Sequence, residues 1–253
     1  MKRMLCFLAV LFLAFSWKGC SVPKSILPEK VIYSSFLIPD EEFAKARPYS
    51  IDEDGTMNYD LEGVKIAVKY LTDTELNEMF PEDSYRKEFS SNPFTYGNWI
   101  DPKLGYTPNR FTVFLVTVYN ILLPKVELDP ANTVLLTNTG DEFRYYGVGL
   151  ADAKNNFELY YSPTKGWSGN ERYVYEQRMG IVRAKLYRRG QKVFRDDKYS
   201  GFIVFAPLPE EVKSVELRIN DFVTRFDEAD QPVEKVDITY KFNRKIEKKK
   251  ATE

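Results

Sequence analysis

Histidine is missing altogether from the 253 residues, and cysteine occurs only twice. Without an imidazole, the chain cannot assemble a Ser-His-Asp triad, a Cys-His nucleophile pair or a histidine metal ligand. Two cysteines are too few for a thiolate metal site, and one of them lies in a removable leader. We therefore predict no metal site, no cofactor and no catalytic constellation, because only carboxylates, lysines, serines and tyrosines remain for chemistry.

An excess of charge of either sign is also missing, since 36 basic residues balance 37 acidic ones. Nucleic-acid binding needs a strongly basic face, so we expect no nucleic-acid partner. Hydrophobic residues make up 43% of the chain and aromatic residues 15%. That content and length are sufficient for one domain with a substantial core, and the many aromatic side chains favour strands.

Only one long hydrophobic run is present, over residues 4–15, directly after the basic pair Lys2 and Arg3. The run is too short to span a bilayer as a helix, and a basic start followed by such a run is typical of a secretory signal. Two cleavage sites remain open. Cleavage after Ser16 would release a soluble protein, whereas cleavage before Cys20 would leave that cysteine as the sole thiol of the mature chain.

The pair Gly19-Cys20 resembles the end of a bacterial lipoprotein signal, in which a small residue precedes the lipidated cysteine. The resemblance implies a signal peptide over residues 1–19, lipidation at Cys20 and a membrane partner through that anchor. Ser21 is not acidic, which in the lipoproteins of two-membraned bacteria implies the outer membrane. We accordingly expect a cell-envelope location, lipid-anchored on the periplasmic or surface face.

Local patterns divide the rest of the chain. Residues 20–58 contain scattered prolines and little periodicity, which predicts a tether. Residues 64–70 alternate apolar and polar side chains, as in a half-buried strand. Thr72 followed by Glu75 is typical of a capping box at the start of a short helix.

Strand patterns become frequent after Phe111. We expect a central strand over 111–119, a hairpin turning at Gly140-Asp141, and three strands between 199 and 242, with a helix starting near Ser168 and its capping partner Glu171. The sequence thus predicts a β-sandwich domain over 59–243, antiparallel and mainly β, with one or two short inserted helices. A basic tail over 244–253 follows it.

The strand rhythm from Phe111 to Phe242, together with the apolar segment from Gly201 to Pro207, resembles the immunoglobulin-like domains of uncharacterised bacterial lipoproteins. The cysteine pair and core tryptophan of antibody domains are missing. The resemblance implies an immunoglobulin-like β-sandwich, and that fold implies no particular function.

The best candidate for a binding loop is the segment 160–167, which contains Tyr160, Tyr161 and Trp167 among polar, proline and glycine residues. Exposed aromatic rings can stack on sugars or anchor a protein partner. The alternative is that the rings fold back as a lid for the following helix. An acidic turn over 227–230 is a weaker candidate for calcium, and Ser162 with Lys165 matches a Ser-x-x-Lys motif whose companion motifs are missing.

These observations favour a lipid-anchored, non-enzymatic envelope protein that acts as a protein-interaction or scaffolding module, with another envelope protein as its partner. The alternative is a glycan- or peptidoglycan-binding module that uses Tyr160, Tyr161 and Trp167. A carboxylate-based hydrolase comes last, because it needs two acidic groups across a cleft.

Overall fold

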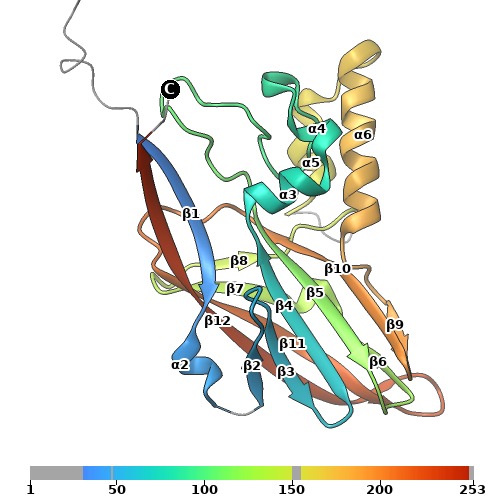
Figure 1. Cartoon of the computed structure of the whole chain (residues 1–253). Helices are drawn as coiled ribbons and strands as arrows, with labels where there is room; N and C mark the ends of the chain where they lie inside the picture. The colour runs from blue at the N-terminus through green and yellow to red at the C-terminus, as the bar shows by residue number, and fades with distance from the viewer. Residues whose placement is uncertain (1–30, 47, 150–154, 251–253) are drawn as a thin grey trace, which may run out of the picture.

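The computed structural model describes residues 31–46, 48–149 and 155–250 (Figure 1). The predicted signal peptide and the Cys20 lipidation site lie outside the described residues. Within the described ranges, no helix is both long enough and apolar enough to cross a lipid bilayer. The prediction of a mainly β fold with antiparallel strands is confirmed, and the two sheets are consistent with a β-sandwich.

Each sheet combines strands that are distant in the sequence. The first sheet has the order β1 (Val31–Pro39), β12 (Pro232–Lys250), β11 (Ser214–Phe226), β6 (Lys125–Glu127) and β9 (Lys192–Phe194), and β7 (Thr133–Thr137) joins β11 to β8 (Glu142–Arg144). The second sheet has the order β10 (Asp197–Phe205), β5 (Thr112–Asn120), β4 (Val64–Leu71), β3 (Met57–Leu61) and β2 (Tyr49–Ile51).

The local strand predictions are largely confirmed. The alternating segment is β4, whose apolar side chains Val64, Ile66 and Val68 are buried. The strand expected over 111–119 is β5, which lies between β10 and β4 and is buried on both faces. The hairpin at Gly140 is formed by β7 and β8. The hydrophobic pattern of the sequence therefore located these strands, because each strand buries at least one of its faces.

The core lies between the two sheets and is held by aromatic side chains. Phe114 of β5 packs against Phe242 of β12, with ring centroids 5.2 Å apart. The buried Tyr240 of β12 donates a hydrogen bond of 2.9 Å from its hydroxyl to the carbonyl of Ile66 on β4. One side chain thus connects the sheets and satisfies its own buried polar group.

A bulge in β11 allows this strand to pair with two different neighbours. Asp221 adopts a positive φ of 57°, and the register with β12 shifts between Ile219 and Phe222. Before the bulge β11 pairs with β7, and after it β11 pairs with β6. The extra residue bends the strand, as bulges generally do, and moves it from one partner to the other.

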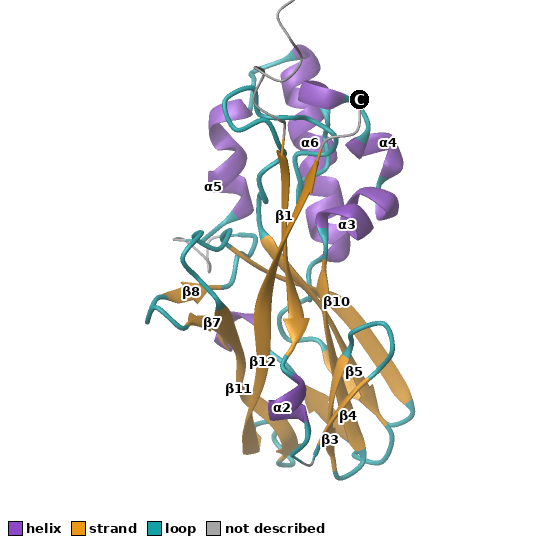
Figure 2. Ribbon diagram, turned by 60° about the vertical axis from the view of Figure 1, so that its left-hand side comes forward, coloured by secondary structure: helices purple, strands orange, loops and turns teal. Residues whose placement is uncertain are grey.

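Helices and loops gather at one end of the sandwich (Figure 2). We call residues 72–110 and 155–187 the cap; its helices are α3 (Asp73–Met79), α4 (Pro81–Ser84), α5 (Phe157–Tyr161) and α6 (Gly169–Lys185), with 3₁₀ turns at Lys87–Phe89 and Ser162–Thr164. Phe94 of the cap packs on Phe202 of β10 at 5.2 Å, and Phe157 packs on Phe111 at the same distance. The cap therefore covers the outer face of the second sheet at this end.

The predicted tether and tail are corrected by the structure. Residues 31–58 form β1, the short helix α2 (Glu41–Ala44), β2 and the start of β3, and residues 244–250 continue β12. Val31 stands opposite Lys250 and Pro39 opposite Phe242 in a two-stranded ribbon. The domain boundaries 59 and 243 are therefore wrong within the described residues, because each end of the chain supplies the backbone hydrogen-bonding partner of the other.

The number of helices was also underestimated, since five α-helices are described and α6 has 17 residues. The capping box at Thr72 is confirmed, with Thr72 and Glu75 bonded reciprocally. The one predicted at Ser168 is wrong, because the Ser168 side chain caps no backbone N–H. Gly169 takes a positive φ of 74°, which turns the backbone between Ser168 and the first helical turn.

Candidate functional site

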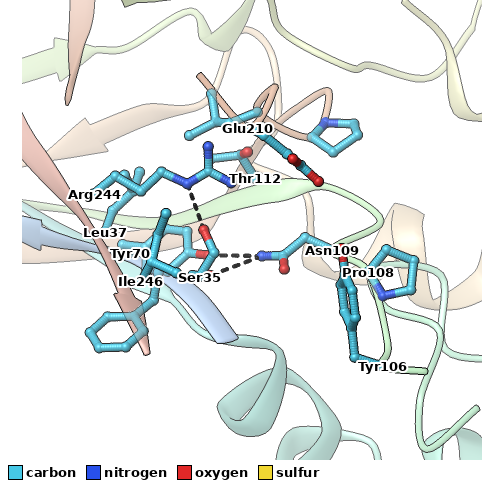
Figure 3. A pocket seen from close by; sticks show the side chains of 13 residues that line it. Ser35, Leu37, Tyr70, Tyr106, Pro108, Asn109, Thr112, Glu210, Arg244 and Ile246 are labelled. Carbon is cyan, nitrogen blue, oxygen red and sulfur yellow. Dashed lines mark hydrogen bonds between the residues drawn. The ribbon is translucent and has the colours of Figure 1, made fainter. Parts of the chain in front are cut away.

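A hollow of about 610 Å³ opens in the mouth between the two sheets, beside the cap (Figure 3). Three segments surround it. They are the ribbon of β1 and β12, the loop that leads into β5, and the loop that follows β10. Apolar and aromatic side chains share the lining with polar groups, which come from Ser35, Asn109, Thr112, Glu210 and Arg244, with the Tyr70 and Tyr106 hydroxyls.

Arg244 supplies positive charge to the wall of this hollow. Its Nε donates a 2.6 Å hydrogen bond to the Ser35 hydroxyl, and its Nη1 donates to the carbonyls of Pro209 and Val212. Within the described residues the guanidinium has no ion-pair partner. Its position is therefore fixed by neutral acceptors, so the charge stays available to a carboxylate or carbonyl of a bound molecule.

Asn109 and Tyr70 form the opposite side of the hollow. The Asn109 amide donates to the Ser35 carbonyl at 3.3 Å and to the Tyr70 hydroxyl at 3.4 Å (Figure 3). Burial raises the pKa of Tyr70 well above its ordinary value. The phenol therefore stays neutral, and its hydroxyl acts as a hydrogen-bonding group rather than as a base.

The edge of β1 is adjacent to the hollow. Asp40 donates its backbone N–H to Lys241 on β12 at 2.9 Å, so even-numbered residues of β1 direct their backbone groups toward β12. Successive residues of a strand alternate, so Ser35 and Leu37 direct theirs toward the outer edge. The Asn109 bond to the Ser35 carbonyl agrees with this phase. The backbone of Pro39 also faces the outer edge. Proline is tolerated there because no backbone N–H is needed to pair with β12.

The predicted binding loop does not form a platform of three rings. Tyr161 is only 3% exposed, and its hydroxyl donates a 2.5 Å hydrogen bond to the Pro93 carbonyl. Tyr160 is partly exposed and packs edge-on against Tyr161, with centroids 4.8 Å apart. Trp167 is fully exposed. The lid interpretation therefore holds for Tyr161, and only Tyr160 and Trp167 remain accessible.

Two arginines of the cap hold Tyr161 in place. Arg110 donates from Nη1 to the Tyr161 hydroxyl at 3.1 Å, and the Arg178 guanidinium lies 5.0 Å from the Tyr161 ring centroid. Burial raises the pKa of Tyr161 and lowers that of Arg178. The arrangement is typical of cation–π packing and joins α6 to α5 and to the loop before β5.

The weaker candidates are occupied by contacts within the protein. Asp230 of the acidic turn forms ion pairs with both Lys125 and Lys192. Ser162 donates its hydroxyl to the Leu159 carbonyl, and Lys165 lies over the Tyr175 ring at 4.8 Å. Among the described residues, no three cysteine, aspartate or glutamate side chains are grouped so that they could hold a metal ion.

Comparison of this chain with known protein families, with curated proteins and with solved structures finds no significant match.

The residues that form the hollow were missed in the sequence because five of them, including Ser35 and Arg244, fell in the expected tether and tail. Ser35 lies in β1 and Arg244 in β12. One signal could have found the second. The apolar alternation through Tyr240 and Phe242 is interrupted at Arg244 and resumes in the same phase at Ile246, which predicts that the strand extends past residue 243. No local pattern places Ser35 beside Arg244.

Proposed function

We propose that this chain is a lipid-anchored, non-enzymatic binding protein of a bacterial cell envelope, which holds an extended segment of another envelope protein. The secretory pattern and the Gly19-Cys20 pair support the anchor, and the serine after Cys20 supports an outer-membrane location in a two-membraned cell. The observation that carries the binding role is the open edge of β1 next to the hollow.

An extended segment fits this place by strand addition. Its backbone would pair with the outward-facing groups of Ser35 and Leu37, and every second side chain would enter the hollow. The Asn109 bond to the Ser35 carbonyl is long and neutral, so an incoming N–H can replace it. Arg244 would bind a carboxylate or a carbonyl of the segment.

The polar groups of the hollow support binding rather than catalysis. An arginine, an amide and hydroxyl groups orient a ligand but do not exchange protons near neutral pH. Among the residues that the structure describes, Glu210 is the one carboxylate that lines the hollow, and it is exposed. A carboxylate-based hydrolase needs a second carboxylate on the other side of its substrate.

Photocross-linking in native membranes tests the proposal. We would place benzoylphenylalanine at Glu210, on the rim of the hollow, and in a control at Glu62, an exposed residue in the turn between β3 and β4. The proposal expects one envelope protein to be cross-linked from position 210 and not from position 62. Equal labelling from both positions would count against a binding site at the hollow.

A matched pair of substitutions checks the same site. Ile246 lines the hollow and is 53% exposed, whereas Ile121 lies in the turn after β5 and is 55% exposed. Ile246→Asp introduces a charge into the apolar wall and is expected to abolish the cross-link. Ile121→Asp is expected to leave it unchanged, because the two variants differ in location rather than in exposure.

The second candidate function, glycan binding, is favoured by one observation, the full exposure of Trp167. Trp167→Ala separates the two functions. Loss of retention on peptidoglycan with an unchanged cross-link at Glu210 would support the glycan-binding role. Unchanged retention would count against glycan binding by Trp167 and in favour of strand addition.

A further inference from the structure

Exposed apolar side chains are concentrated on the cap. Of the fifteen large hydrophobic residues that are exposed in the described ranges, nine belong to the cap, although the cap contains far fewer residues than the sandwich. These nine are Met79, Tyr85, Phe89, Ile100, Leu104, Leu159, Tyr160, Trp167 and Tyr173. Exposed apolar side chains that gather on one part of a protein favour an interaction surface there, with a protein or with a membrane.

The most exposed of them, Trp167, lies at the outer end of the cap. The last turn of α6 adjoins the second sheet, where Leu186 is bridged to Phe202 of β10. The 17 residues of α6 rise about 25 Å from that point. Trp167 precedes the first residue of the helix by two positions, so it is held far from the sandwich. Figures 1 and 2 both show α6 pointing away from the sheets.

The chain enters the described structure at this same end. β1 begins at Val31, which pairs with Lys250 at the end of β12, and Figure 1 shows this end of the ribbon on the side of the cap. Cys20 precedes Val31 by eleven residues. A stretch of eleven residues spans at most about 40 Å, so an anchor at Cys20 keeps the cap close to the membrane.

We propose that the outer end of the cap lies on the surface of the lipid bilayer, with Trp167 at the level of the headgroups. This inference rests on the anchoring in the proposed function and adds the orientation of the domain. Tryptophan and tyrosine favour the membrane interface, because their rings are apolar and their N–H and O–H groups remain hydrated. The last described residues of β12 lie at this same end of the domain, and the sequence there is basic, a composition that favours anionic membrane surfaces.

The opposite end of the sandwich also exposes apolar residues, and it provides the control. Phe194 is 54% exposed and is the last residue of β9, the strand at the lower right of Figure 1, which runs toward the end of the sandwich away from the cap. With the cap on the membrane, Phe194 would face away from the bilayer. The two ends therefore give opposite expectations for one fluorescent reporter.

The test uses the full chain, purified from membranes and reconstituted in vesicles of phosphatidylethanolamine and phosphatidylglycerol that contain brominated phosphatidylcholine. Of the three tryptophans in the chain, Trp17 leaves with the predicted signal peptide, so replacing Trp99 by phenylalanine leaves Trp167 as the one tryptophan of the anchored protein. In the control variant Trp167 is replaced as well, and Phe194→Trp supplies the reporter. We expect bromine to quench most of the Trp167 emission and to leave the emission from position 194 unchanged.

Three other outcomes would overturn the inference in different ways. A chain that floats with the vesicles while Trp167 stays unquenched is anchored but does not lie on its cap. Quenching at position 194 instead shows the reverse orientation. A chain that does not float with the vesicles is not anchored at all, which refutes the proposed function together with this inference.

Discussion

Arg244 of β12 donates a 2.6 Å hydrogen bond from Nε to the hydroxyl of Ser35 on β1, across 209 positions of the sequence (Figure 3). The same guanidinium bonds to the carbonyls of Pro209 and Val212. One side chain therefore connects the first described strand, the last strand and the loop after β10. These three segments form part of the wall of the hollow, so its shape depends on that contact.

Replacing Arg244 with glutamine is expected to lower the free energy of unfolding by about 2 kcal/mol, because charge-assisted hydrogen bonds to partly buried acceptors are lost. Urea unfolding measures the change. Arg225 is the matched control, because it is exposed and pairs with Glu234 at 3.1 Å on the surface. Arg225→Gln should cost less than about 1 kcal/mol. Equal effects would show that Arg244 does not hold the ribbon.

Thr72 and Ser168, the residues that precede α3 and α6 in Ser/Thr-x-x-Glu patterns, make contrasting predictions. The Thr72 hydroxyl accepts a hydrogen bond from the Glu75 N–H at 3.2 Å, and the Glu75 carboxylate accepts one from the Thr72 N–H at 2.9 Å. Thr72→Ala is therefore expected to cost about 1 kcal/mol. Ser168 caps nothing, so Ser168→Ala should change the unfolding free energy by less than about 0.5 kcal/mol. A larger effect at Ser168 would contradict the cap geometry.

The buried carboxyl group of Asp73 is expected to make the free energy of unfolding depend on pH. Its Oδ1 is buried without a hydrogen-bond partner, and burial raises the pKa of the carboxyl to about 7, an effect that Arg110 partly opposes. The folded state thus binds the proton more tightly than the unfolded state, whose pKa is about 3.8. The stability that the protonated group provides is complete below pH 4 and is lost as the pH rises toward 7.

Asp73→Asn removes this titration. From pH 5 to pH 8 the stability of the variant relative to the wild type should increase by on the order of 3 kcal/mol. Urea unfolding at both pH values measures the difference between the two proteins, so other titrating groups cancel. A difference that stays constant from pH 5 to pH 8 would show that Asp73 is ionised throughout.

Gly201 and Gly180 form the last contrasting pair. A Cβ at Gly201 of β10 would lie 2.4 Å from the Tyr187 Cα, so the strand and the segment after α6 approach too closely for any side chain. Gly201→Ala should destabilise the protein by about 2 kcal/mol. A Cβ at Gly180 of α6 meets no neighbouring atom, so Gly180→Ala should stabilise it by up to about 1 kcal/mol. Thermal unfolding of both variants measures the two changes, and shifts of the same sign would be inconsistent with this packing.

The sequence by itself determined those helices and strands that are specified by patterns among neighbouring residues. The alternation in β4, the apolar segment of β5 and the capping box at Thr72 each involve neighbouring residues, so the backbone period or one short contact suffices. The mainly β, antiparallel character follows from several such strands. Its classification as immunoglobulin-like remains part of the resemblance.

The tertiary structure alone decided which segments belong together. Residues 31–39 look like a tether in isolation, and they become β1 because β12 satisfies their backbone hydrogen bonds. Tyr161 resembles a surface ring in the sequence, yet Arg110 and Pro93 bind its hydroxyl in the interior. The hollow combines β1, β12 and two loops. Contacts between residues so far apart in the sequence produce no periodic pattern in it, because they depend on how the sheets and the cap pack together.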